Sequence, residues 1–540
     1  MATATMLRLS DLALPLDHPP EAVLPAIAAR LGVSERAVLR HKLVRRGNDA
    51  RKRGAIKLVY SFDVELADEQ AVLEQLAGDP HVRTAPDTVY RPPIVAPAGW
   101  NGLRPVVIGA GPCGLLAALV LAEMGLRPII IERGKAVRER TKDTWGLWRR
   151  GVLEVESNAQ FGEGGAGTFS DGKLYSRIKD PRHLGRKVLT EFVAAGAPVD
   201  ILTEAHPHVG TFRLVSMVIS LRTKIAALGG EYRFGTRVDG FEREGGAITA
   251  LHLSSGERLA ASHVVLAVGH SARDTFAALY AAGVHIEAKP FAIGVRIEHP
   301  QGWIDRARYG DGAGNPLLGP ASYALAHKAS NGRSVYSFCM CPGGRVVAAT
   351  SEVGRVVTNG MSQYSRAEFN ANSGLVVDIS PERDFPGHPL AGVALQRELE
   401  ERAFAAGGGN YHAPGQTVGD FVKGNPSKAF GSIEPSYKPG VTPTALELCL
   451  PTFVTDAIRE ALPVFGRQMA GYDSPEVVMT GVETRTSSPV RITRGADLQS
   501  LNTRGLYPAG EGAGYAGGIL SAAVDGIKVA EALARDLVAT

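Results

Sequence analysis

One segment limits the fold of this chain more than any other, the stretch from Val106 to Glu132. An apolar run is followed by Gly109, Gly111 and Gly114, an apolar helical stretch and a second apolar run that ends on Glu132, 21 residues after Gly111. The first glycine of such a pattern permits a tight turn, the second lets the backbone approach a pyrophosphate, and the third lets helix and strand pack closely. The segment therefore predicts an α/β unit that binds a dinucleotide.

The predicted site includes more than the glycines. A helix N-terminus, here at Pro112 and Cys113, offers amide donors and partial positive charge to phosphates. Glu132 can accept hydrogen bonds from an adenosine ribose, and we include the adjacent Arg133. The same glycine pattern also matches from Gly162 and from Gly512, but neither match follows an apolar strand and opens a helix, so the pattern alone is weak evidence.

The C-terminal segment, from Gly505 to Leu533, resembles the second FAD fingerprint of the two-dinucleotide-binding-domain flavoproteins. In that family a strand ends in Ala-Gly-Asp/Glu, whose acid binds the ribityl chain, and a helix then directs its positive end at the flavin. The matching residues are Ala509, Gly510 and Glu511 for the strand end and Gly517, Gly518 and Ile519 for the helix start. The resemblance implies FAD as the cofactor.

Further segments are similar to the same family. Val264 to Phe276 resembles its Ala-Thr-Gly strand, with Val268, Gly269 and His270 in that place, and the departure from Thr leaves the contact open. The strand at Val238 matches the one that holds the adenine by backbone groups. Phe161 to Leu174 resembles the loop over the pyrophosphate and flavin, and an ordinary surface loop is the alternative; the predicted contacts are Gly164, Gly165 and Ser170.

Longer strings extend the resemblance over most of the chain. FGEGGAGTFSDGKLYSRIKD, FAIGVRIEHPQ, SFCMCPGGRVVAATSE, TNGMS, GVETRTSSPVRI and the DARKR at Asp49 to Arg53 are similar to those of a widespread bacterial family of FAD-dependent, dehydrogenase-like proteins. The resemblance implies an FAD-dependent oxidoreductase that transfers hydride at flavin N5 to or from an unidentified small molecule. A flavin-bound scaffold without turnover is a further alternative.

The predicted fold class is α/β, with an FAD-binding Rossmann-like domain, an inserted α+β substrate or cap domain and an N-terminal ferredoxin-like α+β module. In the module we expect strands at 6–14, 56–66 and 82–90 and helices at 20–31 and 69–76. The predicted domains are the basic module 1–92, a linker 93–104 rich in proline and glycine, FAD-binding segments 105–287 and 479–540, and the cap domain 288–478.

No second nucleotide fingerprint follows, so flavin reduction must come from a bound substrate or from transient docking of NAD(P)H. Cys339 and Cys341 on one strand share a face at about 6.6 Å, near the upper limit for a disulfide. They are either a redox pair facing the flavin or small buried side chains. The polar candidates for a substrate pocket, or else for an ion-paired rim, are Arg296, Glu298, His299, Glu483, Arg485 and Arg491.

The N-terminal module contains a basic stretch, Arg30 to Lys57, whose charge of +8 exceeds the +4 of the whole chain. Part of it resembles the start of a helix-turn-helix, which would make residues 30–57 a nucleic-acid contact and the protein an RNA-modifying flavoenzyme or redox-sensing binder. A solvated helix face is the alternative. Four cysteines fit a reducing, cytoplasmic compartment. We expect no signal peptide, no membrane span and no metal site.

Overall fold

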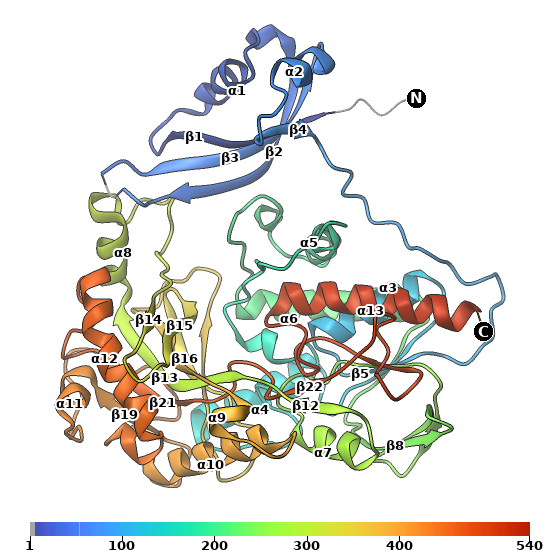
Figure 1. Ribbon diagram of the computed structural model, residues 1–540, viewed down its shortest axis with the longest axis vertical. Helices are drawn as coiled ribbons and strands as arrows, with labels where there is room; N and C mark the ends of the chain where they lie inside the picture. Colours follow the sequence, from blue (N-terminus) through green and yellow to red (C-terminus); the bar gives the residue numbers. More distant parts are fainter. Residues whose placement is uncertain (1–5, 53, 540) are drawn as a thin grey trace.

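The computed structural model describes residues 6–52 and 54–539 of a mixed α/β protein. Arg53, which belongs to the basic stretch, lies outside the described residues. Figure 1 shows a small N-terminal module above a larger body, joined to it by an extended segment that runs down one side. The fold therefore has two parts, and the body is built around two large sheets, of five and seven strands.

The N-terminal module is one sheet with strand order β2-β3-β1-β4, every neighbouring pair antiparallel, and two helices. The alternation of apolar and polar residues in β3 puts Leu58, Tyr60, Phe62, Val64 and Leu66 in the core. The elements in chain order are β1 (Leu7–Pro15), η1 (Pro20–Ala22), α1 (Val23–Leu31), η2 (Glu35–Ala37), β2 (Val38–Asp49), β3 (Lys57–Leu66), α2 (Glu69–Gln75) and β4 (Val82–Thr84).

The basic stretch is not a helix-turn-helix, and that prediction is wrong. After α1 and a short η2, the chain forms the edge strand β2, Val38–Asp49, where helical residues were expected. None of its residues is buried, and its sequence lacks the alternation of apolar and polar residues that marks a strand with one face in the core. Its outer edge is fixed to the body instead, because Arg46 exchanges backbone hydrogen bonds with Thr203 (2.6 Å) and Ala205 (2.7 Å).

The body has a parallel five-stranded sheet at its centre, with order β23-β11-β5-β6-β7. Its strands are short, and every residue of β23, β11, β5 and β6 is buried. The strands are β5 (Val106–Ile108), β6 (Ile129–Ile131), β7 (Glu231–Arg233), β11 (Val264–Leu266) and β23 (Leu506–Pro508).

Alternate residues of these strands enter two different cores. Val107, Ile130 and Val265 face one side, which is covered by α3 (Pro112–Glu123), α5 (Leu184–Ala194), α6 (Thr211–Ala227) and α13 (Ile519–Ala539). Val106 and Ile129 face the other side, covered by α7 (Arg273–Ala281) and a small sheet of β8 (Val238–Glu244), β9 (Ala247–Leu253) and β10 (Arg258–Ala260). The apolar stretch Pro105 to Ala122 is thus β5 and α3, both buried between layers.

The second sheet of the body has seven strands in the order β14-β15-β18-β13-β21-β19-β20. They are β13 (Phe291–Pro300), β14 (Ala326–Lys328), β15 (Ser334–Cys341), β18 (Asn370–Ile379), β19 (Ala413–Thr417), β20 (Val441–Pro443) and β21 (Val478–Glu483). The helix α12 (Thr452–Gln468) packs across β14, β15 and β18, as Figure 1 shows at its left. β13 is buried along its whole length, so this sheet forms the largest core of the molecule.

The remaining elements connect these layers. They are α4 (Val137–Arg150), η3 (Ala166–Phe169), η4 (Val199–Leu202), β12 (Ile286–Ala288), α8 (Gln301–Tyr309), η5 (Gly310–Gly312), β16 (Gly344–Ala348), β17 (Thr358–Ser362), α9 (Pro381–Asp384), α10 (Ala391–Ala406), α11 (Val418–Lys423), η6 (Leu446–Leu448) and β22 (Val490–Ile492). Within the described part of the chain, no helix is long and apolar enough to cross a membrane.

Candidate functional site

The turn after β5 can be built only with glycine at two positions. Gly109 has φ +99°, and a Cβ there would lie 2.4 Å from the carbonyl oxygen of Ala267. A Cβ at Gly114 would lie 1.9 Å from the carbonyl oxygen of Gly109. Atoms do not approach this closely, so each side chain would force β5, β11 and α3 apart. The sheet therefore brings the N-terminus of α3 to its carboxyl edge.

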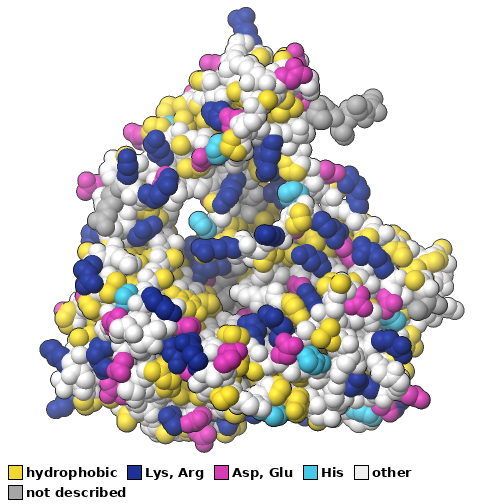
Figure 2. Space-filling view, viewed as in Figure 1, with side chains coloured by type: hydrophobic (Ala, Val, Ile, Leu, Met, Phe, Trp, Pro, Cys, Tyr) yellow, Lys and Arg dark blue, Asp and Glu magenta, His cyan; other side chains and the backbone are white. Residues whose placement is uncertain are grey.

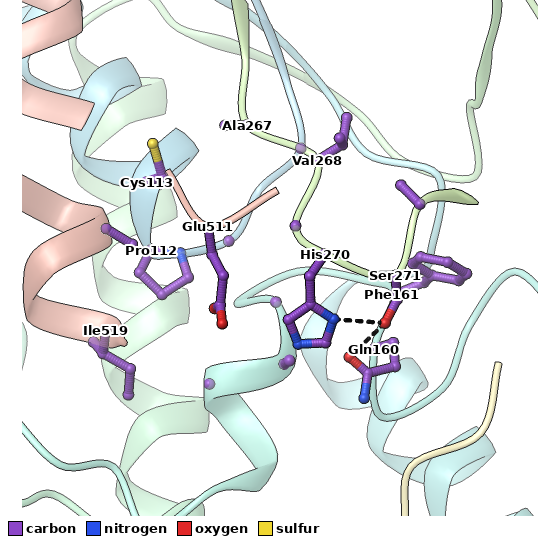
Figure 3. A pocket seen from close by; sticks show the side chains of 18 of the residues that line it. Pro112, Cys113, Gln160, Phe161, Ala267, Val268, His270, Ser271, Glu511 and Ile519 are labelled. Atoms are coloured by element: carbon purple, nitrogen blue, oxygen red, sulfur yellow. Dashed lines mark hydrogen bonds between the residues drawn. The ribbon is translucent and has the colours of Figure 1, made fainter. Parts of the chain in front are cut away.

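A cleft runs along this edge, between the turn, the loop at 160–173 and the seven-stranded sheet. Figure 3 shows part of it, with Pro112, Cys113, Glu511, His270 and Ile519 around the opening. The predicted cofactor residues that line the cleft are Gly109, Gly111, Pro112, Cys113, Glu132, Arg133, Gly165, Ser170, Val238, Gly269, Glu511, Gly518 and Ile519. Gly114, Gly164 and Gly510 lie in the turns behind its surface.

The cleft leaves backbone open to a long ligand. At Gly269, Gly517 and Gly518 an added Cβ would meet nothing within 4 Å, so a side chain there would project into the cleft. At Gly111 its nearest neighbour would be the Cα of Gly165, 3.6 Å away. This glycine-lined path, from the N-terminus of α3 to that of α13, fits an extended dinucleotide with a phosphate-bearing middle.

Glu132 lies buried at one end of the cleft, where β6 ends. Its two carboxylate oxygens accept three backbone hydrogen bonds, from the amides of Ala110 (2.8 Å), Gly134 (2.9 Å) and Gly162 (3.0 Å). Glu132 thus joins the phosphate turn to the glycine-rich loop. The neighbouring Arg133 reaches Asp274 through two hydrogen bonds of 2.9 Å.

The glycine-rich loop is packed into the body and is not an ordinary surface loop. The fully buried guanidinium of Arg140 donates to three of its carbonyls, those of Asn158 (2.8 Å), Ala159 (2.9 Å) and Glu163 (2.8 Å). The amide of Gly164 donates to Ala110 at 2.8 Å, which places the loop against the turn. Sequence reasoning missed Arg140, because a lone arginine on a helix carries no signal that it is buried.

Glu511 follows β23 and points into the cleft in Figure 3. Burial raises its pKa to about 7, and nearby Lys289 only partly opposes this effect. The preceding turn is held by Asp525 of α13, which accepts from the amide of Gly510 (2.8 Å) and is paired with Arg494 (2.6 Å). The turn that carries Glu511 is therefore held against α13.

His270 is the other polar side chain that Figure 3 places at the opening. Its Nδ1 lies 3.0 Å from the hydroxyl of Ser271, which donates to Gln160 (3.2 Å) and accepts from Arg485 (3.0 Å). Burial, together with the positive charges of Arg485 and Arg273, lowers the pKa of His270 to about 3. The ring is neutral at physiological pH and can exchange a hydrogen bond with a bound group.

The opposite wall of the cleft comes from the seven-stranded sheet and its neighbours. Glu483 and Arg485, both predicted, line it, together with the unpredicted Asn359. Arg296 lies fully buried behind Glu483 and forms a hydrogen-bonded ion pair with it at 2.8 Å. Arg485 is held by Glu400 through two hydrogen bonds of 2.9 and 2.7 Å. Glu483 and Arg485 on this wall are thus each paired with a buried side chain of opposite charge, Arg296 and Glu400.

Besides Arg296, three more of the polar candidates do not line the cleft. Glu298 is buried in the sheet and accepts from the backbone amide of Ser436 (3.1 Å). His299 is buried beyond it, with Nε2 2.9 Å from the carbonyl oxygen of Tyr472. Arg491 is exposed on β22. Residue type selected these residues together with Arg296 and Glu483 but could not show which part of the fold each one contacts.

The two cysteines of β15 differ in position. Cys339 lines the cleft and is partly buried, whereas Cys341 lies behind it and is fully buried. The ammonium group of Lys173, from the glycine-rich loop, lies 4.0 Å from each of the two sulfur atoms. Lys173 also lines the cleft and was missed, because nothing in the sequence relates a loop lysine to a strand 166 residues away.

The end of the cleft toward the N-terminal module is basic. Figure 2 shows Lys and Arg side chains gathered around a hollow below this module. Tyr175 lines the cleft and contacts the ring of His206 at 4.7 Å between centroids. The pKa of His206 is lowered by burial and by the positive charges of Arg45 and Arg366. Positive side chains from both parts of the molecule therefore approach this end of the cleft.

Comparison with known proteins adds three family-model matches. A model described as "FAD binding domain" matches residues 104–273, and one described as "FAD-dependent protein, C-terminal domain-like" matches residues 290–486. A domain of unknown function matches residues 6–65. The first match covers β5, β6, β7 and β11 of the five-stranded sheet, but not β23, and the second covers the whole of the seven-stranded sheet.

An uncharacterized protein of Clostridium beijerinckii is 45% identical over 529 residues, which is 97% of this chain and 98% of that protein. Among solved structures, a glycine oxidase of Geobacillus kaustophilus is 12% identical with a TM-score of 0.35, covering 80% of this chain and 94% of its own. A triple mutant of the flavin-dependent brominase Bmp2 is 13% identical with a TM-score of 0.38, covering 81% of each chain.

Proposed function

The chain belongs to the family of FAD-dependent proteins, with FAD as its cofactor, and we propose that it is an oxidoreductase acting on an anionic small molecule. The bound flavin would supply hydride transfer at N5. The cofactor would extend along the glycine-lined path from Glu132 to Ile519, and the substrate would lie between it and the wall at Glu483 and Cys339.

The observation that carries the proposal is that one continuous cleft has two unlike walls. One wall offers backbone at the N-termini of α3 and α13, which suits pyrophosphate and a flavin carbonyl. The other offers Glu483, Arg485, Asn359 and Cys339, which a cofactor held by backbone does not need. A second ligand beside the cofactor explains why charged side chains converge there.

The substrate class follows from the basic end of the cleft. A carboxylate or phosphate that enters beside Tyr175 passes Arg45 and Arg366, whose charge favours an anion. Arg366 is paired with Asp171, a lining residue, so it faces the cleft from a fixed position. Within this proposal, residues 288–478 act as the substrate domain, and the ferredoxin-like N-terminal module, 1–92, closes the entrance.

The proposal is tested by anaerobic reduction of the purified holoprotein with NADH and with NADPH, followed by oxidation with a panel of metabolites. Flavin absorbance should bleach with a donor and return with an anionic acceptor. A flavin that no donor and no acceptor on the panel changes would instead indicate a scaffold without turnover. A folded protein without flavin absorbance would contradict the proposal.

The nucleic-acid alternative now depends on charge alone, since β2 is a strand and not a recognition helix. In this alternative the basic end of the cleft binds RNA and not a small anionic substrate. RNA retention that falls with salt and is lost in an Arg45→Glu variant would favour it. Small-anion turnover that is sensitive to the same substitution, without RNA retention, favours the oxidoreductase.

A further inference from the structure

We propose that Cys339 and Cys341 form a redox-active dithiol that exchanges two electrons with the flavin. The inference deepens the proposed function and rests on FAD binding in the cleft. It assigns to the wall opposite the cofactor a reactive group of the protein itself, in addition to the substrate.

The backbone of β15 brings the two thiols together. In a regular strand, residues two apart point the same way but lie about 6.6 Å from each other. Here the pairing of β15 with β18 shifts register between Phe338 and Cys341, and Cys339 has φ +45°, in the left-handed region. At this bulge the thiol of Cys341 donates to the carbonyl oxygen of Cys339, and both sulfur atoms lie 4.0 Å from the ammonium nitrogen of Lys173, so the two side chains share one polar contact.

The same bulge is held from three sides. The guanidinium of Arg296 donates to the carbonyl oxygen of Cys339 at 3.0 Å, and the ammonium of Lys173 donates to that of Met340. The thiol of Cys341 lies 3.3 Å from the Cys339 carbonyl oxygen. The left-handed conformation is strained for a residue other than glycine, and these contacts maintain it at Cys339.

Electrostatics favour a thiolate at the exposed member of the pair. The pKa of Cys339 is lowered because Cys341 donates a hydrogen bond to its sulfur and because Lys173 and Arg296 place positive charge beside it. The pKa of Cys341 is raised by that same hydrogen bond and by burial. One thiolate and one thiol in contact is the arrangement in which one sulfur attacks and the other resolves.

The position of Cys339 gives the pair its electron partner. Cys339 and Lys173 line the same cleft as Glu511, Gly518 and Ile519, where the family resemblance locates the flavin. The charge of Cys339 also contributes to the raised pKa of Glu511. By contrast, Cys449 is buried under η6 with a raised pKa of about 12 and faces no cleft residue. It is therefore a matched internal control.

The step balances with FAD as the acceptor. The thiolate of Cys339 and the thiol of Cys341 would lose one S–H bond and gain one S–S bond. The two electrons and the one proton released would pass to oxidised FAD, giving the anionic reduced flavin, and the reverse step would regenerate the thiolate and the thiol. Lys173, 4.0 Å from both sulfur atoms, stabilises the thiolate form in either direction.

The experiment counts electrons in the holoprotein. The protein is oxidised with ferricyanide, freed of it and titrated anaerobically with dithionite while flavin absorbance is recorded. The wild type should take up about four electrons per FAD, two for the flavin and two for the disulfide. Cys339→Ser and Cys341→Ser should each take up about two, whereas Cys449→Ser should still take up about four.

Peptide mass spectrometry gives a readout that does not depend on the flavin. The peptide containing both cysteines should lose the mass of two hydrogens after oxidation and bind two alkylating groups after reduction. Lys173→Met should slow alkylation of Cys339 at neutral pH about tenfold or more by raising its pKa. A wild type that takes up two electrons, with both thiols still free after oxidation, overturns the dithiol and leaves the proposed function intact. A colourless folded protein overturns both.

Discussion

The two walls of the cleft are built on different principles. The cofactor wall comprises residues 109–165 and 511–519. It presents mainly backbone, because glycines leave room for a ligand to approach the main chain. The opposite wall presents Cys339, Glu483 and Arg485, each held by buried partners. We therefore expect an added side chain to disrupt the cofactor wall, and the loss of a charged group to disrupt the opposite wall.

The largest effect is expected on the cofactor wall. Gly109→Ala puts a Cβ 2.4 Å from a backbone carbonyl in a turn with φ +99°. FAD content of the purified protein should fall at least 100-fold, because the N-terminus of α3 moves away from the phosphates. Gly196→Ala, at φ +104° with nothing within 4 Å, carries the same backbone strain without the clash. It should cost only about 1 kcal/mol and leave FAD content unchanged.

Next in size is the loss of a buried counter-charge behind the other wall. Glu400 is fully buried between Arg273 and Arg485, so Glu400→Gln should lower the free energy of unfolding by about 3–5 kcal/mol. Glu398→Gln on the same helix removes an exposed pair with Arg402 and should change it by less than about 0.5 kcal/mol. Equal effects of the two variants in denaturant titrations would contradict the contrast between the walls.

That carboxylate also has a pH signature. The pKa of Glu400 is lowered in the folded state because the charges of Arg273 and Arg485 outweigh the opposing effect of burial. Its contribution is therefore fully present above its ordinary pKa near 4.5 and is lost as pH falls below that value. The Tm difference between wild type and Glu400→Gln should shrink steadily in acid.

For Glu511, on the cofactor wall, we expect the pH dependence of stability to have the opposite sign. Its pKa of about 7 exceeds the ordinary 4.5, so the charged form costs stability, increasingly as pH rises from 4.5 to 7. Glu511→Gln should stabilise the FAD-free protein by up to about 3 kcal/mol at pH 8. It should have no effect at pH 4. If Glu511→Gln destabilised the protein at pH 8, the ionised carboxylate of Glu511 would not be unfavourable in the folded state.

The smallest effect is expected at the cleft entrance. Arg45→Glu reverses a charge beside His206 without touching either wall. It should lower kcat/KM for an anionic substrate several-fold at low salt, through KM, and the difference should fade at high salt. Arg36→Glu, on the same module within η2, is the matched control. A loss that persists at high salt would contradict steering.

The part of the cofactor wall from Gly109 to Glu132 can be recognised in the sequence, because it is one local segment. Gly109, Gly111 and Glu132 lie within one strand–turn–helix–strand segment, and each glycine has a meaning that survives without tertiary context. β2 could not be recognised, since an edge strand with no buried residue lacks the alternation that identifies strands. Its charges suggested a helix because no apolar pattern opposed that interpretation.

The second wall depends on contacts between distant segments. Lys173 meets Cys339 across 166 residues, and Arg296 meets Glu483 across 187. Residue type placed Arg296, Glu483, Arg485 and the cysteines among the candidates, but the same reasoning also selected Glu298, His299 and Arg491. Only the folded structure separates Cys339, Glu483 and Arg485, which line the cleft, from the candidates that do not.

The account's central claim is that bound flavin exchanges electrons with an anion held against the side-chain wall. The most direct measurement is anaerobic stopped-flow reaction of the holoprotein with carboxylate substrates and with their neutral amides, followed by flavin absorbance. The account predicts that the carboxylate changes the flavin spectrum at least tenfold faster than its amide and that Arg45→Glu narrows this ratio. Equal rates for the two members of every pair would contradict it.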